Sequence, residues 1–330
     1  MIQSVTPFAL TPSQPIFGKN YIKLVSYNIR FGLGTDQKID LERIADTVKD
    51  ADIIALQEVD RCWKRSGMTD QPEIISGYLK QYHWLYFPAF DVDASKTNDD
   101  GSIINRRRQF GPMVLSRWPI RMARYILFPK LGTSNDYNMD TGAIECIVDT
   151  PSGPLMVYSL HLSASSTRDR LLQINRLLEF YRCAPVSGGS WTGTVATTTD
   201  SDKIMMAAQN WSNGESEPII PKEAVLMGDF NFEPDSEEYN IMVGTPDTSQ
   251  NRVAHFDSFV DSWTAAKERS GDRVSCYPDR PDRELEHPLC FDYCFVSPVL
   301  SNSLERVWVD RDAVGSDHKP YWIELSTDLA

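Results

Sequence analysis

The chain has 330 residues, of which 41% are hydrophobic and 24% are charged, proportions typical of a globular protein with a sizeable core. A formal net charge of −13 and a pI near 4.9 exclude a protein whose affinity depends on a broad basic surface, as nucleic-acid affinity usually does. They do not exclude phosphate chemistry, because a bound divalent cation can supply positive charge locally.

The sequence contains no clear motif for membrane insertion, secretion or cysteine-based metal binding. No apolar run reaches the roughly 18 residues of a membrane-spanning helix, so no membrane span is expected. Residues 1–18 lack a basic region and contain three prolines, unlike a signal peptide, so a cytoplasmic protein is expected. Six cysteines without CxxC spacing predict neither a thiolate metal site nor a disulfide framework. The oligomeric state stays open.

The N-terminal region alternates strands with a helix. We expect an irregular arm at 1–20 and then a single domain at 21–330. A strand is predicted at 21–29, where apolar and polar residues alternate as far as Asn28. A helix at 40–49 with Asp40 as its cap follows, and then a strand at 52–60 with Glu58 at its carboxyl end. This order favours a layered α/β domain.

The next stretch is dominated by a polar segment. A helix is predicted at 72–81 and a strand at 84–90. Residues 91–108 are interpreted as a solvated loop, and the alternative is a loop that faces a phosphate. This segment ends in three consecutive arginines, Arg106, Arg107 and Arg108.

The central region predicts three strands and a long helix. The strands are expected at 124–128, 143–148 and 155–160, and His161 follows the last of them. An amphipathic helix is predicted at 167–181. Residues 184–221 are partly low in complexity and are interpreted as a loop insertion with a short helix at 205–211.

An apolar run at 224–227 is followed by Gly228, Asp229 and Asn231. The run reads as a buried strand, and residues two apart on an extended segment point to the same side. A carboxylate and a carboxamide would then project together from the end of a buried strand. The alternative is a polar turn in which both side chains cap the backbone.

The C-terminal region places acids and a histidine at strand ends. A strand at 291–296 carries Asp292 among apolar residues, where a buried charge requires a partner. Strands at 306–309 and 321–325 flank a segment with Asp317 and His318. Each such residue alone is explained by a cap or a turn, but their joint occurrence at strand ends predicts one common site. The set comprises Asn28, Glu58, His161, Asp229, Asn231, Asp292, Asp317 and His318.

These motifs resemble the endonuclease/exonuclease/phosphatase superfamily, which has the deoxyribonuclease I-like fold, and in particular its bacterial metal-dependent hydrolases. The matching segments follow the family's order over residues 21–326, namely 26–30, 56–59, 159–162, 228–231, 291–293 and 315–320. The resemblance implies an α/β fold, a four-layer α/β/β/α sandwich with two largely antiparallel central sheets. It also implies hydrolysis of a phosphoester with the help of Mg²⁺ or Mn²⁺.

The resemblance further implies a metal site. Glu58 would be the principal ligand, helped by Asn28 and by Asp317. Oxygen ligands of this kind suit Mg²⁺ or Mn²⁺.

It also implies a set of catalytic residues. Asp229 and Asn231 would position the attacking water and the phosphate. His318, oriented by Asp292, matches the family's general base, and His161 would donate to the phosphate or to the leaving oxygen. The pattern leaves open whether Asp229 or His318 takes the proton.

The substrate is less defined than the reaction. The family acts on nucleic acids, inositol phosphates, sphingomyelin and smaller phosphodiesters. The acidic charge favours a small or lipid-like phosphoester, diester or monoester, over DNA or RNA. The alternatives are a nuclease and, in another class, a catalytically silent interaction protein. Substrate-selecting residues are expected at Arg106–Arg108 and in the insertion, whereas Pro112 stands where related hydrolases often have an asparagine.

Overall fold

The computed structural model describes residues 21–134, 137–193, 199–201, 212, 215–247, 252–253, 255, 257–277 and 289–327. The expected arm at 1–20 and the short helix expected at 205–211 lie outside these residues.

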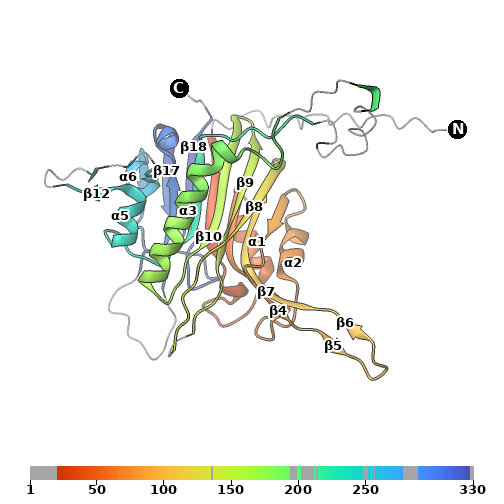
Figure 1. Cartoon of the computed structure of the whole chain (residues 1–330). Coiled ribbons are helices and arrows are strands. Elements are labelled where there is room, and N and C mark those ends of the chain that lie inside the picture. Colours follow the sequence, from red (N-terminus) through yellow and green to blue (C-terminus); the bar gives the residue numbers. More distant parts are fainter. Residues whose placement is uncertain are drawn as a thin grey trace.

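Two large β-sheets form the centre of the molecule (Figure 1). The first sheet has the order β15-β17-β18-β1-β2-β7-β3. Strand β4 also pairs with β7. Its strands are β1 (Tyr21–Asn28), β2 (Ile53–Arg61), β3 (His83–Tyr86), β4 (Phe90–Asp93), β7 (Arg107–Ser116), β15 (Glu268–Ser270), β17 (Leu304–Val309) and β18 (Tyr321–Ser326).

The second sheet has the order β14-β16-β11-β10-β9-β8. Its strands are β8 (Ile120–Leu127), β9 (Gly142–Thr150), β10 (Gly153–His161), β11 (Ala224–Asp229), β14 (Val260–Asp261) and β16 (Asp292–Val296). Among the described strand pairs of both sheets, β1–β2, β10–β11 and β15–β17 are parallel and the others are antiparallel. Both sheets are therefore largely antiparallel, as predicted.

Helices cover the outer face of each sheet. Helices α1 (Leu41–Val48) and α2 (Gln71–Tyr78) pack on the first sheet, and α3 (Thr167–Ser187) and α5 (Glu237–Val243) pack on the second. The Asp40 side chain accepts a hydrogen bond from the Arg43 N–H and caps α1, as expected. The smaller elements are η1 (Arg30–Gly32), β5 (Lys96–Thr97), β6 (Ile103–Ile104), β12 (Thr245–Pro246), β13 (Arg252–Val253), α6 (Ser262–Ala265) and η2 (Pro298–Ser303).

The strands are buried on both faces. In β1, Leu24 belongs to the core between the two sheets, and its neighbour Val25 belongs to the core beneath α1 and α2. Both side chains are fully buried. Burial on both faces also explains why strands such as β2 and β11 contain continuous apolar runs in the sequence. Together with the helical layers, it confirms the predicted four-layer α/β/β/α sandwich.

The polar segment at 91–108 is mostly exposed, as predicted, but it forms a hairpin rather than a loop. It contains the end of β4, then β5 paired with β6, and then the start of β7. The turn uses Gly101 with φ +83°, and the hairpin projects away from the sheets (Figure 1). Its two-residue strands are too short to produce a recognisable hydrophobic alternation, so the sequence did not predict the hairpin.

Helix α3 is longer than predicted. It continues beyond 181 to Ser187 and includes Pro185, so the first residues of the expected insertion are helical. Pro185 has no backbone N–H to donate to the residue four positions earlier, and α3 ends two residues after it. Among the described residues, no helix has the length and apolar character needed to cross a membrane.

Candidate active site

The site lies where strand ends of the two sheets meet. The first sheet contributes Asn28 at the end of β1 and Glu58 within β2, and the segment between β17 and β18 contributes Asp317 and His318. The second sheet contributes three residues in register on neighbouring strands. His161 of β10 pairs with Asp229 of β11, which pairs with Asp292 of β16.

The Asp229 carboxylate lies at the centre of this site. Its Oδ2 atom is 3.6 Å from Nε2 of His161 and 3.7 Å from Nε2 of His318. The same oxygen accepts a hydrogen bond of 2.9 Å from Nδ2 of Asn28. Burial raises the pKa of Asp229, although the two nearby histidines act in the opposite direction. Two imidazoles and one amide therefore converge on a single buried carboxylate oxygen.

His318 is held by a second carboxylate. Its Nδ1 atom is 2.7 Å from Oδ2 of Asp292, which is fully buried. Burial alone would lower the pKa of His318, but the charges of Asp292, Cys276 and Asp229 outweigh it and raise that pKa well above its usual value. Nδ1 faces a carboxylate acceptor, so a neutral His318 would keep its proton there and leave Nε2 as the acceptor.

Glu58 is placed by a β-bulge rather than by the end of a strand. Strand β2 continues to Arg61, and its register with β7 shifts between Leu56 and Val59. Glu58 lies in this bulge with φ +60°, a left-handed conformation that is uncommon for a residue other than glycine. The Asn28 amide donates a hydrogen bond of 3.0 Å to Oε1 of Glu58. The predicted strand at 52–60 agrees with β2, but the bulge at Glu58 was not predicted, because an apolar run does not reveal a bulge.

Asn231 is close to Asp229 for a different reason from the one expected. Its φ is +53°, so the two residues are not on one extended segment. The Asn231 N–H donates to Oδ1 of Asp229 at 2.9 Å, and its Nδ2 donates to the Leu162 carbonyl at 3.0 Å. The polar turn and the shared site are thus both present.

Asp317 lies beside His318 but is turned toward an arginine. Its Oδ2 atom is 3.5 Å from Nε of Arg30, and its Oδ1 accepts a hydrogen bond of 3.3 Å from Ser316. The role of Asp317 as a metal ligand remains a prediction.

His161 has one unsatisfied nitrogen. Its Nδ1 atom is buried and has no hydrogen-bond partner among the described residues. The imidazole packs against the Phe110 ring, with a centroid distance of 6.2 Å. Nδ1 thus remains without an orienting carboxylate in the described part of the chain.

Cys276 is a residue of the site that the sequence did not indicate. Its Sγ atom is 3.4 Å from Nε2 of His318, and the two residues form an isolated antiparallel bridge. Burial raises the pKa of the Cys276 thiol to about 11. The two positions are 42 residues apart, and no motif links them.

The three arginines expected to bind substrate have different environments. Arg107 pairs with Asp91, with 2.9 Å between its Nε atom and Oδ1 of Asp91. Arg108 is exposed, and its guanidinium lies 5.0 Å from the centre of the Trp63 ring. Arg106 pairs through its backbone, where its N–H donates to the Ser95 hydroxyl at 3.2 Å.

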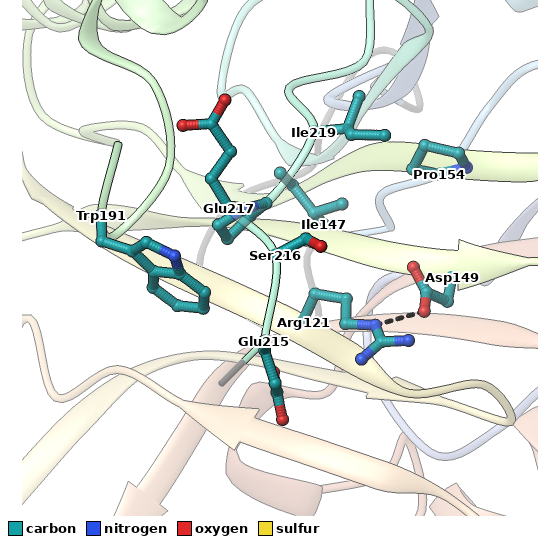
Figure 2. A pocket seen from close by; sticks show the side chains of 10 residues that line it. Arg121, Ile147, Asp149, Pro154, Trp191, Glu215, Ser216, Glu217 and Ile219 are labelled. Carbon is teal, nitrogen blue, oxygen red and sulfur yellow. Dashed lines mark hydrogen bonds and ion pairs between the residues drawn. The ribbon is translucent and has the colours of Figure 1, made fainter. Parts of the chain in front are cut away.

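The described part of the insertion is remote from this site. It lines a pocket of about 540 Å³ beside the Arg121–Asp149 ion pair (Figure 2). Asp149 pairs with Pro154 at one end of the β9–β10 ladder, and Ala143 pairs with Leu160 at the other. Pro154 is thus roughly 23 Å along the strand from His161. This distance separates the described insertion residues from the reacting groups, contrary to the expectation that they select substrate.

Pro112 lies within β7, and its carbonyl accepts a hydrogen bond of 3.0 Å from the Phe87 N–H.

Two overlapping groups of side chains could hold a metal ion. One comprises Glu58, His161 and Asp229, and the other comprises Asp229, Asp292 and His318. Within each group the ligand atoms lie within 4.8 Å of one another. Carboxylate oxygens in both groups fit a hard divalent cation, whereas a thiolate-rich zinc site is not formed by the described residues.

Comparison with known proteins defines the class. The model of the endonuclease/exonuclease/phosphatase family matches residues 25–318, so the chain belongs to this family of phosphoesterases. No curated protein matches the chain significantly.

Solved structures share the fold at low sequence identity. An endonuclease/exonuclease/phosphatase from Beutenbergia cavernae has 17% identity and a TM-score of 0.58, over 93% of this chain and 72% of that one. One from Bacteroides vulgatus has 16% identity and a TM-score of 0.57, over 93% and 99%. A mannosyl-6-phosphatase of Bacteroides thetaiotaomicron has 16% identity and a TM-score of 0.53, over 92% and 99%.

Proposed function

We propose that the protein is a metal-dependent hydrolase that cleaves a phosphoester by attack of water at phosphorus. The observation that carries this proposal is the convergence of two histidine Nε2 atoms on one buried carboxylate oxygen, at 3.6 and 3.7 Å. The Asn28 amide joins that carboxylate to Glu58, at 2.9 and 3.0 Å. Hydrolysis of a phosphoester requires this combination of a proton acceptor, a proton donor and a metal ligand.

Glu58 is the principal metal ligand in this proposal, with Asn28 and Asp317 in support. Glu58 is only partly buried, and its carboxylate fits Mg²⁺ or Mn²⁺. A bound divalent cation would neutralise charge on the phosphoryl oxygens and stabilise the leaving oxygen.

The proton transfers are assigned to the remaining residues. In its neutral form, His318 accepts the proton of the attacking water at Nε2, because Asp292 holds the proton-bearing Nδ1. Asp229 orients that water, and Asn231 keeps a second amide N–H for a phosphoryl oxygen. His161 donates from Nε2 to the phosphate or to the leaving oxygen.

A small or lipid-like phosphoester fits the chain better than a nucleic acid. The net charge of −13 opposes binding along a polyanionic backbone. The neighbour named as a mannosyl-6-phosphatase supports including sugar phosphates among the substrates tested. The direct test is a screen of phosphomonoesters and phosphodiesters with Mg²⁺ or Mn²⁺, with the His318→Ala protein as blank.

The first prediction concerns the catalytic residues. His161→Ala, Asp229→Ala and His318→Ala should each reduce kcat/KM by at least about 10²-fold, the lower range for loss of a general acid or base. Circular dichroism should show that each variant is folded. Full activity in any folded variant would remove that residue from the mechanism.

The second prediction concerns the metal. Glu58→Gln replaces a charged ligand by a neutral one, so half-maximal activity should require more Mg²⁺ than in the wild type. A titration of activity against metal concentration measures this shift. An unchanged requirement would contradict the assignment of Glu58.

The two alternatives make distinct predictions. A nuclease would nick plasmid DNA in a metal-dependent way, and His161→Ala would abolish the nicking. A silent interaction protein would turn over no phosphoester in the screen and bind no metal.

A further inference from the structure

Two arginines lie against one indole beside the proposed active site. The Cζ atom of Arg65 is 4.2 Å from the centre of the Trp63 ring, and Cζ of Arg108 is 5.0 Å from it. We call Trp63, Arg65 and Arg108 the arginine–tryptophan cluster. Two cations on one ring form a local positive patch in a chain whose net charge is −13.

This cluster borders the reacting groups. The Phe110 ring lies 5.4 Å from Cζ of Arg65 and 6.2 Å from the His161 imidazole, so one aromatic ring separates the cluster from a proposed catalytic residue. On its other side, Arg65 lies over Phe31 at 4.3 Å. Phe31 directly follows Arg30, which contacts Asp317. The cluster therefore adjoins the position of a bound phosphoester.

Arg65 is fixed in place and still has free donors. Its Nε and Nη2 atoms donate to the carboxylate of Asp60 at 3.0 and 2.8 Å, and that carboxylate is fully buried. A guanidinium has five N–H groups, and Nη1 of Arg65 has no acceptor among the described residues. The side chain is 38% exposed.

The Arg108 guanidinium has no acceptor among the described residues. Its neighbour Arg107 pairs with Asp91, and the nearby Arg61 pairs with Asp70. Arg65 is paired with Asp60 in the same way, so Arg108 supplies the uncompensated positive charge of the cluster and offers a complete guanidinium beside Arg65. An anion is the ligand that this arrangement suits, because guanidinium groups bind phosphate through two parallel hydrogen bonds.

We propose that Arg65 and Arg108 bind a second phosphate of the substrate, one that is not hydrolysed. This inference rests on the proposed function, since the subsite adjoins the same reacting groups. The second phosphate belongs either to a small bisphosphate or to the adjacent nucleotide of an oligonucleotide. The two sources have the same chemistry at the cluster and are separated by experiment.

Binding is measured by calorimetry with Mg²⁺ in the His318→Ala background, which prevents turnover. Fructose 1,6-bisphosphate should bind at least about tenfold more tightly than fructose 6-phosphate, a ratio within the range for hydrogen bonds to charged groups. Arg108→Gln should abolish this preference, and Arg65→Lys should reduce it because lysine lacks the planar fork. Arg108 is exposed, so its substitution leaves the fold intact. Arg65→Gln, in contrast, would leave the buried Asp60 carboxylate without its ion-pair partner.

A matched control is available on α3. Arg176 is exposed and lies 4.5 Å from the Phe180 ring, so it shares the exposure and the aromatic contact of Arg108, but it is paired with Glu179. Arg176→Gln should keep the preference for the bisphosphate.

A second comparison uses a thymidine dinucleotide with and without a 5′-phosphate. The ligand pair whose ratio of affinities depends more strongly on Arg108 identifies the source of the second phosphate.

The outcomes separate this inference from the proposed function. Equal binding of the mono- and bisphosphate in both arms, or a preference that survives Arg108→Gln, would overturn the subsite even if phosphoesters are hydrolysed. Loss of the preference in Arg108→Gln would support the subsite even if no tested phosphoester were hydrolysed.

Discussion

At the scale of the residue, Asn28 connects the two sheets at the site. Its Nδ2 atom donates to Glu58 on the first sheet and to Asp229 on the second, and its Oδ1 accepts the Arg30 N–H at 3.0 Å. The side chain is fully buried, and an amide can satisfy all these groups without adding charge. Asn28 therefore holds two carboxylates close together, which like charges alone would oppose.

The cysteines allow a third prediction at this scale. At pH 8 a thiol reagent should modify the exposed Cys183 first and leave Cys276 and Cys290 unmodified in the folded protein. Burial raises the pKa of these two thiols to about 11 and about 12, so their reactive thiolate forms only as the pH approaches those values. Peptide mass spectrometry locates the adducts, and Cys183→Ser is the control. Early modification of Cys276 would show that the site is more open than its burial indicates.

At the scale of the element, the buried strands were predictable from the sequence, but the local backbone conformations that orient the site's side chains were not. The run 224–227 predicted β11 because strands buried on both faces are continuously apolar. The bulge at Glu58 and the left-handed conformation of Asn231 depend on pairing and local hydrogen bonds, which no apolar pattern records. The Cys276–His318 contact likewise depends on a bridge between distant segments.

Strand β11 carries a fourth prediction, at Gly228. A Cβ atom there would lie 2.1 Å from the Leu160 carbonyl oxygen of the adjacent parallel strand. Gly228→Ala should therefore destabilise the protein by about 1–3 kcal/mol and reduce activity, because Asp229 follows directly. Urea unfolding measures the change. Gly77→Ala is the matched control: Gly77 is an exposed residue of α2, a Cβ atom there would have nothing within 4 Å, and the substitution should stabilise by about 0.5–1 kcal/mol. Equal effects at both positions would contradict the close approach of β10 and β11.

At the scale of the whole molecule, activity depends on how the two sheets are aligned. Glu58 and Asn28 come from one sheet and His161, Asp229 and Asp292 from the other, so neither sheet alone contains the site. The core between the sheets is mostly apolar and gives little directional control.

A pair of buried polar residues supplies that alignment and carries the fifth prediction. Gln57 Nε2 donates to Ser159 Oγ at 3.2 Å, and Ser159 Oγ donates to the Leu56 carbonyl at 3.2 Å. Both side chains are fully buried. Gln57 precedes Glu58, and Ser159 lies two residues before His161, so this pair links the two halves of the site. Ser159→Ala should cost about 1–3 kcal/mol, because it leaves the Gln57 amide unsatisfied, and should lower kcat through misalignment of the sheets.

A double-mutant cycle distinguishes this alignment from simple packing. Gln57→Met with Ser159→Ala removes both partners, so its cost in the free energy of unfolding should be smaller than the sum of the two single costs by about 0.5–3 kcal/mol. Ser76→Ala, which removes a surface hydrogen bond of α2, should change stability by no more than about 0.5 kcal/mol. Additive costs would show that the two residues act independently. If the double variant regains stability but not kcat, the polar link serves the site rather than the fold, because an apolar interface can hold the sheets together without fixing Glu58 opposite His161.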